Sequence, residues 1–425
     1  MAMKSLKVVD LFAGCGGLSL GLELAGFEPI FVNELNDDAR STYIRNRVER
    51  QAWLQEKGFH SSDVKEMVLR KRYLTELEKR FKDSFGMEHG DLDLLVGGPP
   101  CQGFSGIGHR RSYSVDKENL PSNHLYQDMA TIIHRLQPRA FLFENVRGLL
   151  NSKWTENGSN GEIWRDIVAT YKSIPGYSIA AQLVYAKDYG VPQNRPRILL
   201  VGIRDDVPAA IEREGHDENA VGRGYLPVPK RGQAPDLIDL LGDLVDANYE
   251  NGGSTESYSH AATTKIQKFL RMPLDGNSPL KKGAPVTEHE YSRHNPTVLA
   301  KFKAMHKSGG EVPEKFRTKK FAQKLLPSRW GENGPTITAT SLADDYVHFS
   351  QPRTLTVREW ARLQMFPDWY QFSGKRTTGG IRRAGNPREG IFDREVPKYT
   401  QIGNAVPVGL AKAVGDHLAS ILVHK

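Results

Sequence analysis

The first 205 residues alternate short apolar runs with amphipathic segments. The apolar runs predict six strands, at Lys7–Leu11, Pro29–Asn33, Leu92–Val96, Ala140–Glu144, Ile179–Tyr185 and Ile198–Ile203. Helical periodicity between them predicts helices that include Gly17–Ala25, Asp37–Asn46 and Tyr126–Leu136. Such alternation is typical of a doubly wound α/β (Rossmann-like) domain with a mostly parallel sheet.

The pattern changes after about residue 205, where Gly and Pro become more frequent and strands less clear. Helical periodicity returns at Val357–Met365 and Val408–Leu422. We therefore expect a large α/β domain built from residues 1–205 and 350–425, and a second, smaller domain formed by residues 206–349.

Two further segments stand apart from this pattern. Between Val64 and Phe85, the apolar residues of a charged segment recur at helical spacing, which predicts a surface helix that packs one face onto the domain. The stretch Lys375–Val396 is rich in Gly and Arg, and the pattern assigns no role to it or to residues 65–88.

Charge is divided unevenly along the chain, whose formal net charge is +8. Residues 206–259 hold 4 Lys/Arg against 11 Asp/Glu, whereas residues 260–330 hold 15 against 5. The basic block is either a solvated face or a surface that contacts phosphates, so a polyanionic partner is one interpretation.

Composition excludes several classes of protein. We find no apolar run near the roughly 18 residues of a membrane span, and no apolar segment of a secretory signal at the N-terminus. Two cysteines cannot form a disulfide framework, and neither has the neighbours of a zinc site. We expect a reduced, cytoplasmic protein with no metal and no membrane partner.

The stretch DLFAGCGGLS, at Asp10–Ser19, follows the first predicted strand and opens a helix. Its glycines permit a tight turn and close approach of a ligand to the backbone. Glu34 ends the next strand, where a carboxylate can accept hydrogen bonds from ribose hydroxyls. We predict a nucleoside cofactor, with NAD, FAD and S-adenosylmethionine all open and an empty turn as the alternative. Cys15 is interpreted as a small packing residue.

Three polar groups follow later strands. The loop GGPPCQGFS, Gly97–Ser105, places Cys101 at the carboxyl end of a strand, where α/β proteins bind ligands; the thiol is either an activated nucleophile or a packing residue. Glu144 ends a further strand and either faces the same pocket or caps a helix. In Gln193–Arg197, QNRPR, the alternating arginines either clamp one ligand group or form surface ion pairs.

The order of these motifs resembles that of the cytosine-C5 DNA methyltransferases, in particular the bacterial enzymes of restriction–modification systems. DLFAGCGGLSLG is similar to their cofactor loop, GGPPCQGFS to their nucleophile loop, ENV at Glu144–Val146 to their glutamate motif, and QNRPR to their Q-x-R-x-R motif. Arg353–Gln364 and Gln401–Pro407 match the two C-terminal motifs. The resemblance covers residues 7–205 and 335–415.

The resemblance implies a covalent mechanism. Cys101 would add to carbon 6 of a flipped-out cytosine, which makes carbon 5 nucleophilic toward the methyl group of S-adenosylmethionine. Glu144 would contact ring N3 and the exocyclic amine, Arg197 would hold O2, and Arg195 would support the same pocket. An RNA cytosine methyltransferase and a relative that binds nucleic acid without catalysis are the alternatives. The three groups Cys101, Glu144 and Arg197, all present, favour an enzyme.

The resemblance also assigns binding residues. Those implied for the cofactor are Phe12, Gly14, Gly16, Glu34, Asp63, Pro100, Leu125, Asn404 and Ala405, with Asp91 as a competitor for the role of Asp63. Ser105, Arg110 and Arg111 would meet DNA phosphates from a loop that closes on the duplex. The implied partner is double-stranded DNA, read by residues 206–349. The implied protein is a monomer paired in function with a restriction endonuclease.

Overall fold

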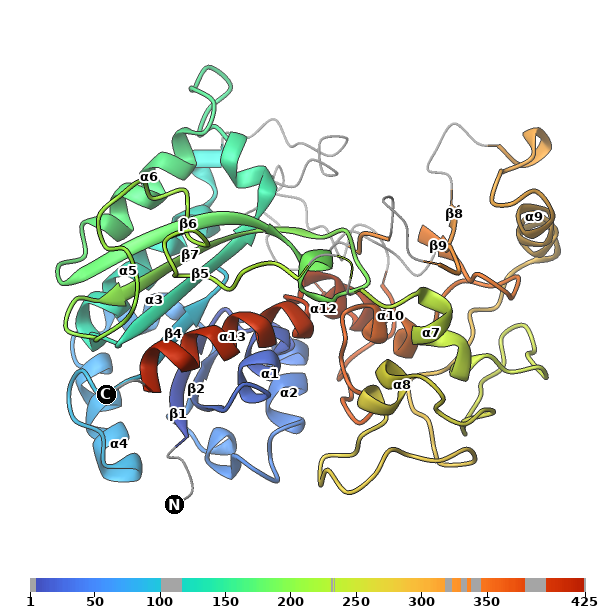
Figure 1. Cartoon of the computed structure of the whole chain (residues 1–425), viewed down its shortest axis with the longest axis horizontal. Helices are drawn as coiled ribbons and strands as arrows, with labels where there is room; N and C mark the ends of the chain where they lie inside the picture. Colours follow the sequence, from blue (N-terminus) through green and yellow to red (C-terminus); the bar gives the residue numbers. More distant parts are fainter. Residues whose placement is uncertain are drawn as a thin grey trace.

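The computed structural model describes residues 5–100, 117–230, 232, 234–317, 323–329, 335–337, 345–378 and 395–423. Two lobes lie side by side, with a sheet and its covering helices in the larger one and α7, α8 and α9 in the smaller one (Figure 1). The helices of the smaller lobe are α7 Leu237–Leu241, α8 Lys265–Leu270 and α9 Pro296–Lys307. Two short strands, β8 Lys324–Leu325 and β9 Tyr346–Val347, pair in parallel there.

The larger lobe is built on a seven-stranded sheet of order β3-β2-β1-β4-β5-β7-β6. Its strands are β1 Leu6–Leu11, β2 Phe27–Asn33, β3 His60–Ser61, β4 Leu94–Gly97, β5 Ala140–Val146, β6 Tyr177–Tyr185 and β7 Pro196–Arg204. β7 runs antiparallel to both of its neighbours, and the pairs from β3 to β5 are parallel. The doubly wound α/β prediction is confirmed, and the two-residue β3 is the strand it missed.

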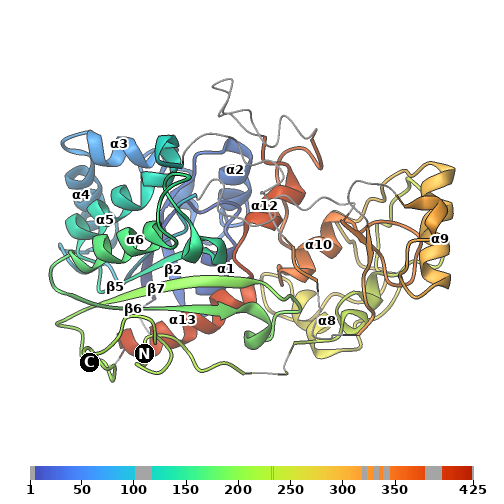
Figure 2. The same ribbon diagram turned by 90° about the horizontal axis from the view of Figure 1, so that it is seen from above.

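Helices cover both faces of this sheet, as Figure 2 shows. Apolar residues of α3 Val64–Leu69, α4 Tyr73–Phe85, α5 Leu125–Leu136 and α6 Glu162–Lys172 share one core with one face of the sheet. Those of α1 Gly17–Glu23 and α13 Val408–Val423 share a second core with the other face, joined by residues 207–226. The chain therefore returns to the larger lobe in its last helix. α2, Asp37–Arg45, follows β2.

The charged segment at 64–85 forms α3 and α4 rather than one helix. Met67, Leu74, Leu77 and Phe81 are buried in the core, and Phe85 packs against it. Helical spacing thus identified the apolar face correctly, and the segment packs against the sheet as predicted.

Residues 398–423 are, within the described ranges, long and apolar enough to cross a membrane by composition. They form two helices, α12 Lys398–Asn404 and α13, which are separated by Ala405–Pro407. Leu410, Val414 and Leu418 of α13 are buried against the larger lobe. This stretch is therefore accounted for as core structure.

α10, Val357–Leu363, joins the two lobes, and every one of its residues is buried. Trp360 and Leu363 share a core with Leu240 and Leu270 of α7 and α8. Arg362 forms ion pairs with Asp243 (Nη1 to Oδ1, 2.5 Å) and with Asp368 (Nη2 to Oδ2, 2.6 Å).

The same carboxylate, Asp243, also pairs with Arg271 across 2.5 Å. Asp243 is 2% exposed, and both arginines are fully buried. Isolated charges at these positions would be costly, so each arginine depends on its carboxylate partner. The network therefore ties the smaller lobe to the helix that follows it.

We expect Asp243→Asn to lower the free energy of unfolding by about 3–5 kcal/mol, because it leaves two buried arginines with one anionic partner fewer. Asp239→Asn is the matched control: Asp239 is exposed on α7, and the change should stay within about 0.5 kcal/mol. Urea unfolding of the two variants measures the difference. Equal losses would contradict the role given to the network.

Candidate active site

The sheet brings the groups predicted from the sequence to one edge. Leu11, at the end of β1, is paired with Asn33 of β2 and with Gly97 of β4. Val146, at the end of β5, is paired with Arg197, because β7 is reversed and begins where β5 ends. The glycine turn, Glu34, the Gly97–Pro100 loop, Glu144 and Arg197 therefore all lie at the carboxyl edge of the parallel strands, where α/β proteins bind ligands.

The glycine turn has a backbone that few residues adopt. Phe12, Gly14 and Gly16 have φ values of 57°, 57° and 86°, in the left-handed region. A Cβ on Gly16 would lie 2.8 Å from the Tyr43 ring and 2.9 Å from an Arg47 nitrogen, so glycine is required there for space as well as conformation. Left-handed Phe12 is a strained position, as found at ligand sites.

Glu34 fixes the glycine turn through its side chain. Its carboxylate accepts hydrogen bonds from the backbone N–H groups of Gly14 and Asn36, each at 2.8 Å. Burial raises the pKa of Glu34, and these hydrogen bonds oppose the rise. Each carboxylate oxygen keeps a further lone pair that can accept a hydrogen bond from a ligand hydroxyl.

Leu35 is a candidate that the sequence did not reveal. It follows Glu34 and its side chain is 72% exposed, although leucine is usually buried. An exposed apolar side chain beside the glycine turn offers a surface for a flat ring. The sequence does not distinguish Leu35 from a buried leucine at the end of a strand, so only the structure reveals its exposure.

Asp63 lies at the carboxyl ends of the parallel strands, whereas Asp91 lies at their amino ends. Asp63 follows β3, and the carbonyl of Ser61 in β3 accepts a hydrogen bond from the Glu34 N–H at 3.1 Å. The Asp63 side chain caps α3 by accepting a hydrogen bond from the Lys65 N–H at 2.9 Å. Asp91 precedes β4 and accepts the Glu88 N–H at 2.8 Å. Only Asp63 is at the edge that carries Glu34.

Glu144 and Arg197 form a buried ion pair, with Oε1 2.5 Å from Nε. Burial raises the pKa of Glu144 above its ordinary value, and the positive charges of Arg197 and Arg195 oppose the rise. Burial also lowers the pKa of Arg197, against the attraction of Glu144. The carboxyl group can therefore be protonated more readily than a carboxyl group in water.

The ENV motif also holds the loop that leads to Cys101. A Cβ on Gly98 would lie 2.8 Å from Glu144 Oε2, so only glycine lets the loop approach the carboxylate this closely. The Asn145 amide donates to the Pro99 carbonyl at 3.1 Å. Pro100 follows on the surface.

The other predicted residues lie in different environments. Leu125 opens α5 and, like Phe12, packs against the core of the larger lobe. Asn404 is exposed at the end of α12, and Ala405 is buried. Arg195 donates to backbone carbonyls of Gly403 and Ala405 rather than to Glu144. The predicted residues Cys101, Ser105, Arg110 and Arg111 lie outside the described residues.

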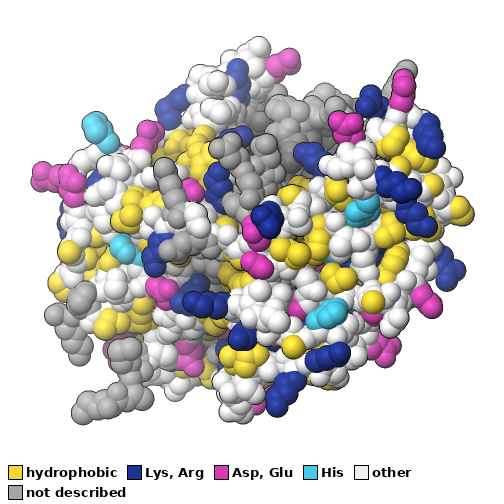
Figure 3. All heavy atoms as spheres, turned by 45° about the vertical axis from the view of Figure 1, so that its right-hand side comes forward, with side chains coloured by type: hydrophobic (Ala, Val, Ile, Leu, Met, Phe, Trp, Pro, Cys, Tyr) yellow, Lys and Arg dark blue, Asp and Glu magenta, His cyan; other side chains and the backbone are white. Residues whose placement is uncertain are grey.

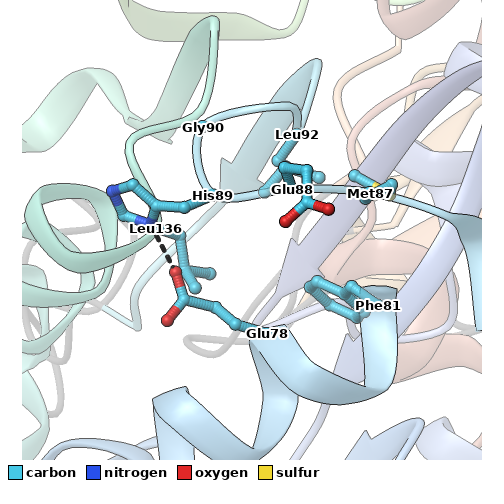
Figure 4. A pocket seen from close by; sticks show the side chains of 8 residues that line it. All are labelled: Glu78, Phe81, Met87, Glu88, His89, Gly90, Leu92 and Leu136. Carbon is cyan, nitrogen blue, oxygen red and sulfur yellow. Dashed lines mark hydrogen bonds and ion pairs between the residues drawn. The ribbon is translucent and has the colours of Figure 1, made fainter. Parts of the chain in front are cut away.

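A small hollow at the opposite edge of the sheet is excluded as this site. It is lined by Glu78, Phe81, Met87, Glu88, His89, Gly90, Leu92 and Leu136 (Figure 4). Its volume is about 20 Å³, enough for a water molecule but not a nucleoside. Its polar pair, His89 Nδ1 and Glu78 Oε1, lies at 2.6 Å and is satisfied internally.

Comparison with known proteins decides the family. The family model for C-5 cytosine-specific DNA methylases matches residues 6–420. The chain belongs to this family. It is therefore an enzyme, a DNA cytosine methyltransferase, and the use of S-adenosylmethionine follows from the family.

Individual relatives agree along nearly the whole chain. The type II methyltransferase M.DdeI of Desulfomicrobium norvegicum is 29% identical over 97% of this chain and 88% of its own length. M.PspPI of a Psychrobacter species is 30% identical over 99% of this chain and 80% of its own length. A solved structure from Escherichia coli, described as a prophage-encoded DNA modification methyltransferase, has a TM-score of 0.66 at 25% identity and covers 98% of this chain and 99% of its own.

In this methyltransferase, Cys15 has the properties of a packing residue, as predicted. Its side chain is 1% exposed, and its thiol donates to the Gln401 carbonyl at 3.3 Å. Burial, with a smaller contribution from Glu34, raises the pKa of Cys15 to about 12.

We expect iodoacetamide to leave Cys15 unmodified in the folded enzyme, because a pKa of about 12 leaves roughly one thiol in ten thousand ionised at pH 8. In urea the same residue should react at the rate of a free cysteine. Peptide mapping after timed labelling checks both statements. Rapid labelling of Cys15 under native conditions would contradict the assignment.

Proposed function

We propose that this enzyme transfers a methyl group from S-adenosylmethionine to carbon 5 of a flipped-out cytosine in a specific double-stranded DNA sequence, through a covalent bond between Cys101 and carbon 6. The observation that carries the proposal is the buried Glu144–Arg197 ion pair beside Gly98, at the ligand-binding edge of the sheet. Gly98 stands three residues before the cysteine in the chain.

The residues of the chain have separate tasks in this reaction. The Cys101 thiolate adds to carbon 6, and the electron pair of the 5,6 double bond moves to carbon 5. Burial raises the pKa of Glu144, which helps its carboxyl group to take up a proton and pass it to ring N3, where negative charge gathers. Arg197 holds O2. Carbon 5 would then take the methyl group, and the proton on N3 would return to Glu144. Loss of the carbon 5 proton and departure of the Cys101 sulfur from carbon 6 would restore the aromatic ring.

The residues at the glycine turn fit S-adenosylmethionine. Glu34 offers acceptors for the ribose hydroxyls, Leu35 an apolar surface for the adenine ring, and Asp63 an acceptor for the adenine amine. The floor of this cofactor site is formed by Phe12, Gly14 and Gly16. The wall around the methionine part of the cofactor is formed by Pro100, Leu125, Asn404 and Ala405. When bound, the cofactor supplies a methyl group on a positively charged sulfur.

We further propose that residues 1–205 and 350–425 carry the chemistry and that residues 206–349 recognise the DNA sequence, through the part that follows residues 207–226, because those residues pack on the catalytic sheet. In the smaller lobe, a hollow of about 750 Å³ is lined by the basic residues Lys301, Arg317 and Lys324, with Glu311, Gln323 and apolar residues beside them. Figure 3 shows Lys and Arg side chains spread over the exposed face of this lobe. Phosphate contacts from such residues position a duplex, and contacts with base edges select the sequence.

The setting of the enzyme is also a proposal. We infer a monomer in the bacterial cytoplasm, whose methylation protects host DNA from a cognate restriction endonuclease. The support is that relatives such as M.DdeI and M.PspPI carry the name type II methyltransferase.

We expect Cys101→Ser to lower methyl transfer by several orders of magnitude, since a neutral hydroxyl is a much weaker nucleophile than a thiolate. Wild-type enzyme should form a denaturant-resistant adduct with duplex DNA that contains 5-fluorocytosine, because fluorine at carbon 5 blocks the final elimination. Cys15→Ala should still form this adduct. An adduct in Cys101→Ser, or one mapped to Cys15, would refute the mechanism.

Positive charge on the smaller lobe should control the salt dependence of DNA binding. Lys303 and Lys307 are exposed on α9, Lys281 and Lys282 are exposed in a turn, and none forms an ion pair within the described residues; Lys319 and Lys320 lie outside them. We expect alanine at either described pair to weaken binding to all sequences. For every phosphate that the protein no longer neutralises, the log–log salt slope should fall by about 0.9.

Lys71 and Lys79 make a matched control pair. They are exposed beside and on α4, which Figures 1 and 2 place at the end of the molecule opposite α9. Replacing both should leave the salt slope unchanged in titrations at several salt concentrations. If both smaller-lobe pairs behaved like this control, the proposed DNA surface would be wrong.

A further inference from the structure

Arg195 makes contacts unlike those of Arg197, two residues further along. Its Nη2 atom donates to the carbonyl oxygens of Gly403 at 2.6 Å and Ala405 at 3.1 Å, and its Nη1 atom donates to the Ile337 carbonyl. Its side chain is almost completely buried, at 2% exposure. We infer that Arg195 is a positioning residue that holds the Gly403–Ala405 wall of the cofactor site, and not a contact of the target cytosine.

Burial of the Arg195 guanidinium removes a charged group from water, so its hydrogen bonds are needed to keep it there. Within the described residues Arg195 has no carboxylate at ion-pair distance, in contrast to Arg197. Burial and the nearby charge of Arg197 hold the pKa of Arg195 well below its usual range. The charge of Glu144 opposes this lowering, and backbone carbonyls accept the hydrogen bonds of the buried cation and are fixed in place in return.

Two linked glutamines also contribute to this wall, which Gln364 contacts directly. Gln193 donates to the Gln364 side chain at 2.9 Å and accepts the Ile337 N–H at 3.0 Å. Gln364 donates to the Ile402 carbonyl at 2.7 Å and the Ala405 carbonyl at 3.3 Å. The backbone from Ile402 to Ala405 is therefore held by side chains from two motifs that are far away in sequence.

This wall meets the glycine turn directly. A Cβ on Gly17 would lie 2.5 Å from the Val406 carbonyl oxygen and 3.0 Å from the Ala405 Cβ, so the two segments touch. A shift of the Ala405 segment would change the space beside the turn. Because Ile337 lies within residues 206–349 and its carbonyl accepts a hydrogen bond from Arg195, the same side chain also ties the cofactor wall to residues 335–337.

The inference rests on the proposed function, since it assigns this wall to S-adenosylmethionine. The test compares Arg195→Met and Arg195→Lys with Arg197→Met, using two measurements on each full-length protein. Calorimetry gives the affinity for S-adenosylmethionine without DNA, and methyl transfer to duplex DNA gives kcat at saturating cofactor. Arg204→Met is the matched control, because Arg204 also donates to a backbone carbonyl (Gly90, 2.8 Å) but at the other end of β7.

We expect Arg195→Met to weaken cofactor binding by about tenfold to a hundredfold, a larger loss than its loss of kcat. Arg195→Lys, which keeps a charged donor, should recover part of the affinity. Arg197→Met should show the reverse pattern, with kcat reduced and cofactor affinity retained, and Arg204→Met should change neither.

Other outcomes would overturn the inference. A loss of kcat with unchanged cofactor affinity in Arg195→Met would return Arg195 to the cytosine pocket, and equal losses in both quantities would mean general damage. If Arg195→Met fails to fold in thermal unfolding, Gln364→Met tests the same wall and must weaken cofactor binding likewise. A wild-type enzyme that binds S-adenosylmethionine but methylates no duplex would refute the proposed function instead.

Discussion

The active site depends on the reversal of one strand. β7 runs antiparallel between β5 and β6, so its first residues lie beside the last residues of β5. In an all-parallel sheet, the amino end of β7 would lie at the far edge. The reversal places Arg197 next to the end of β5 and lets it form the ion pair with Glu144, which a parallel strand would prevent.

A second constraint is the burial of charge between the lobes. Arg353 and Glu359 form a pair at 2.7 Å, and both are fully buried, as is the Arg362 pair with Asp243. Pairs of this kind contribute little net stability compared with apolar packing, yet losing one partner is costly. A buried ion pair is favourable only when its two side chains and the residues around them keep one arrangement. We infer that the network fixes how the smaller lobe sits on the catalytic sheet more than it adds to stability.

The sequence predicted those features that local pattern controls. Apolar runs predicted six strands, and the glycine turn with Glu34 predicted the edge of the sheet that binds a ligand. Both predictions were possible because short stretches of sequence determine where strands end and where glycines adopt left-handed conformations. The sequence did not predict β3, because two residues are too few to show a periodicity and the position of β3 depends on its pairing with β2. The exposure of Leu35 and the partners of Gln193 depend on segments far away in the chain, which no short pattern records.

Arg195 and Arg197 illustrate the limit most clearly. Alternate residues of a strand project to one side, which predicted that both arginines face one pocket. β7 begins at Pro196, however, so Arg195 lies outside the strand and the alternation does not apply to it. Its guanidinium instead contacts the segment that ends α12. A single proline residue therefore separates the residue that holds Glu144 from the residue that holds Ala405. Because these two side chains share one short stretch of backbone, the distance between the proposed cytosine pocket and the proposed cofactor wall is set locally. Methyl transfer requires that distance to be held closely, and a junction of three residues holds it better than the contact between two lobes would.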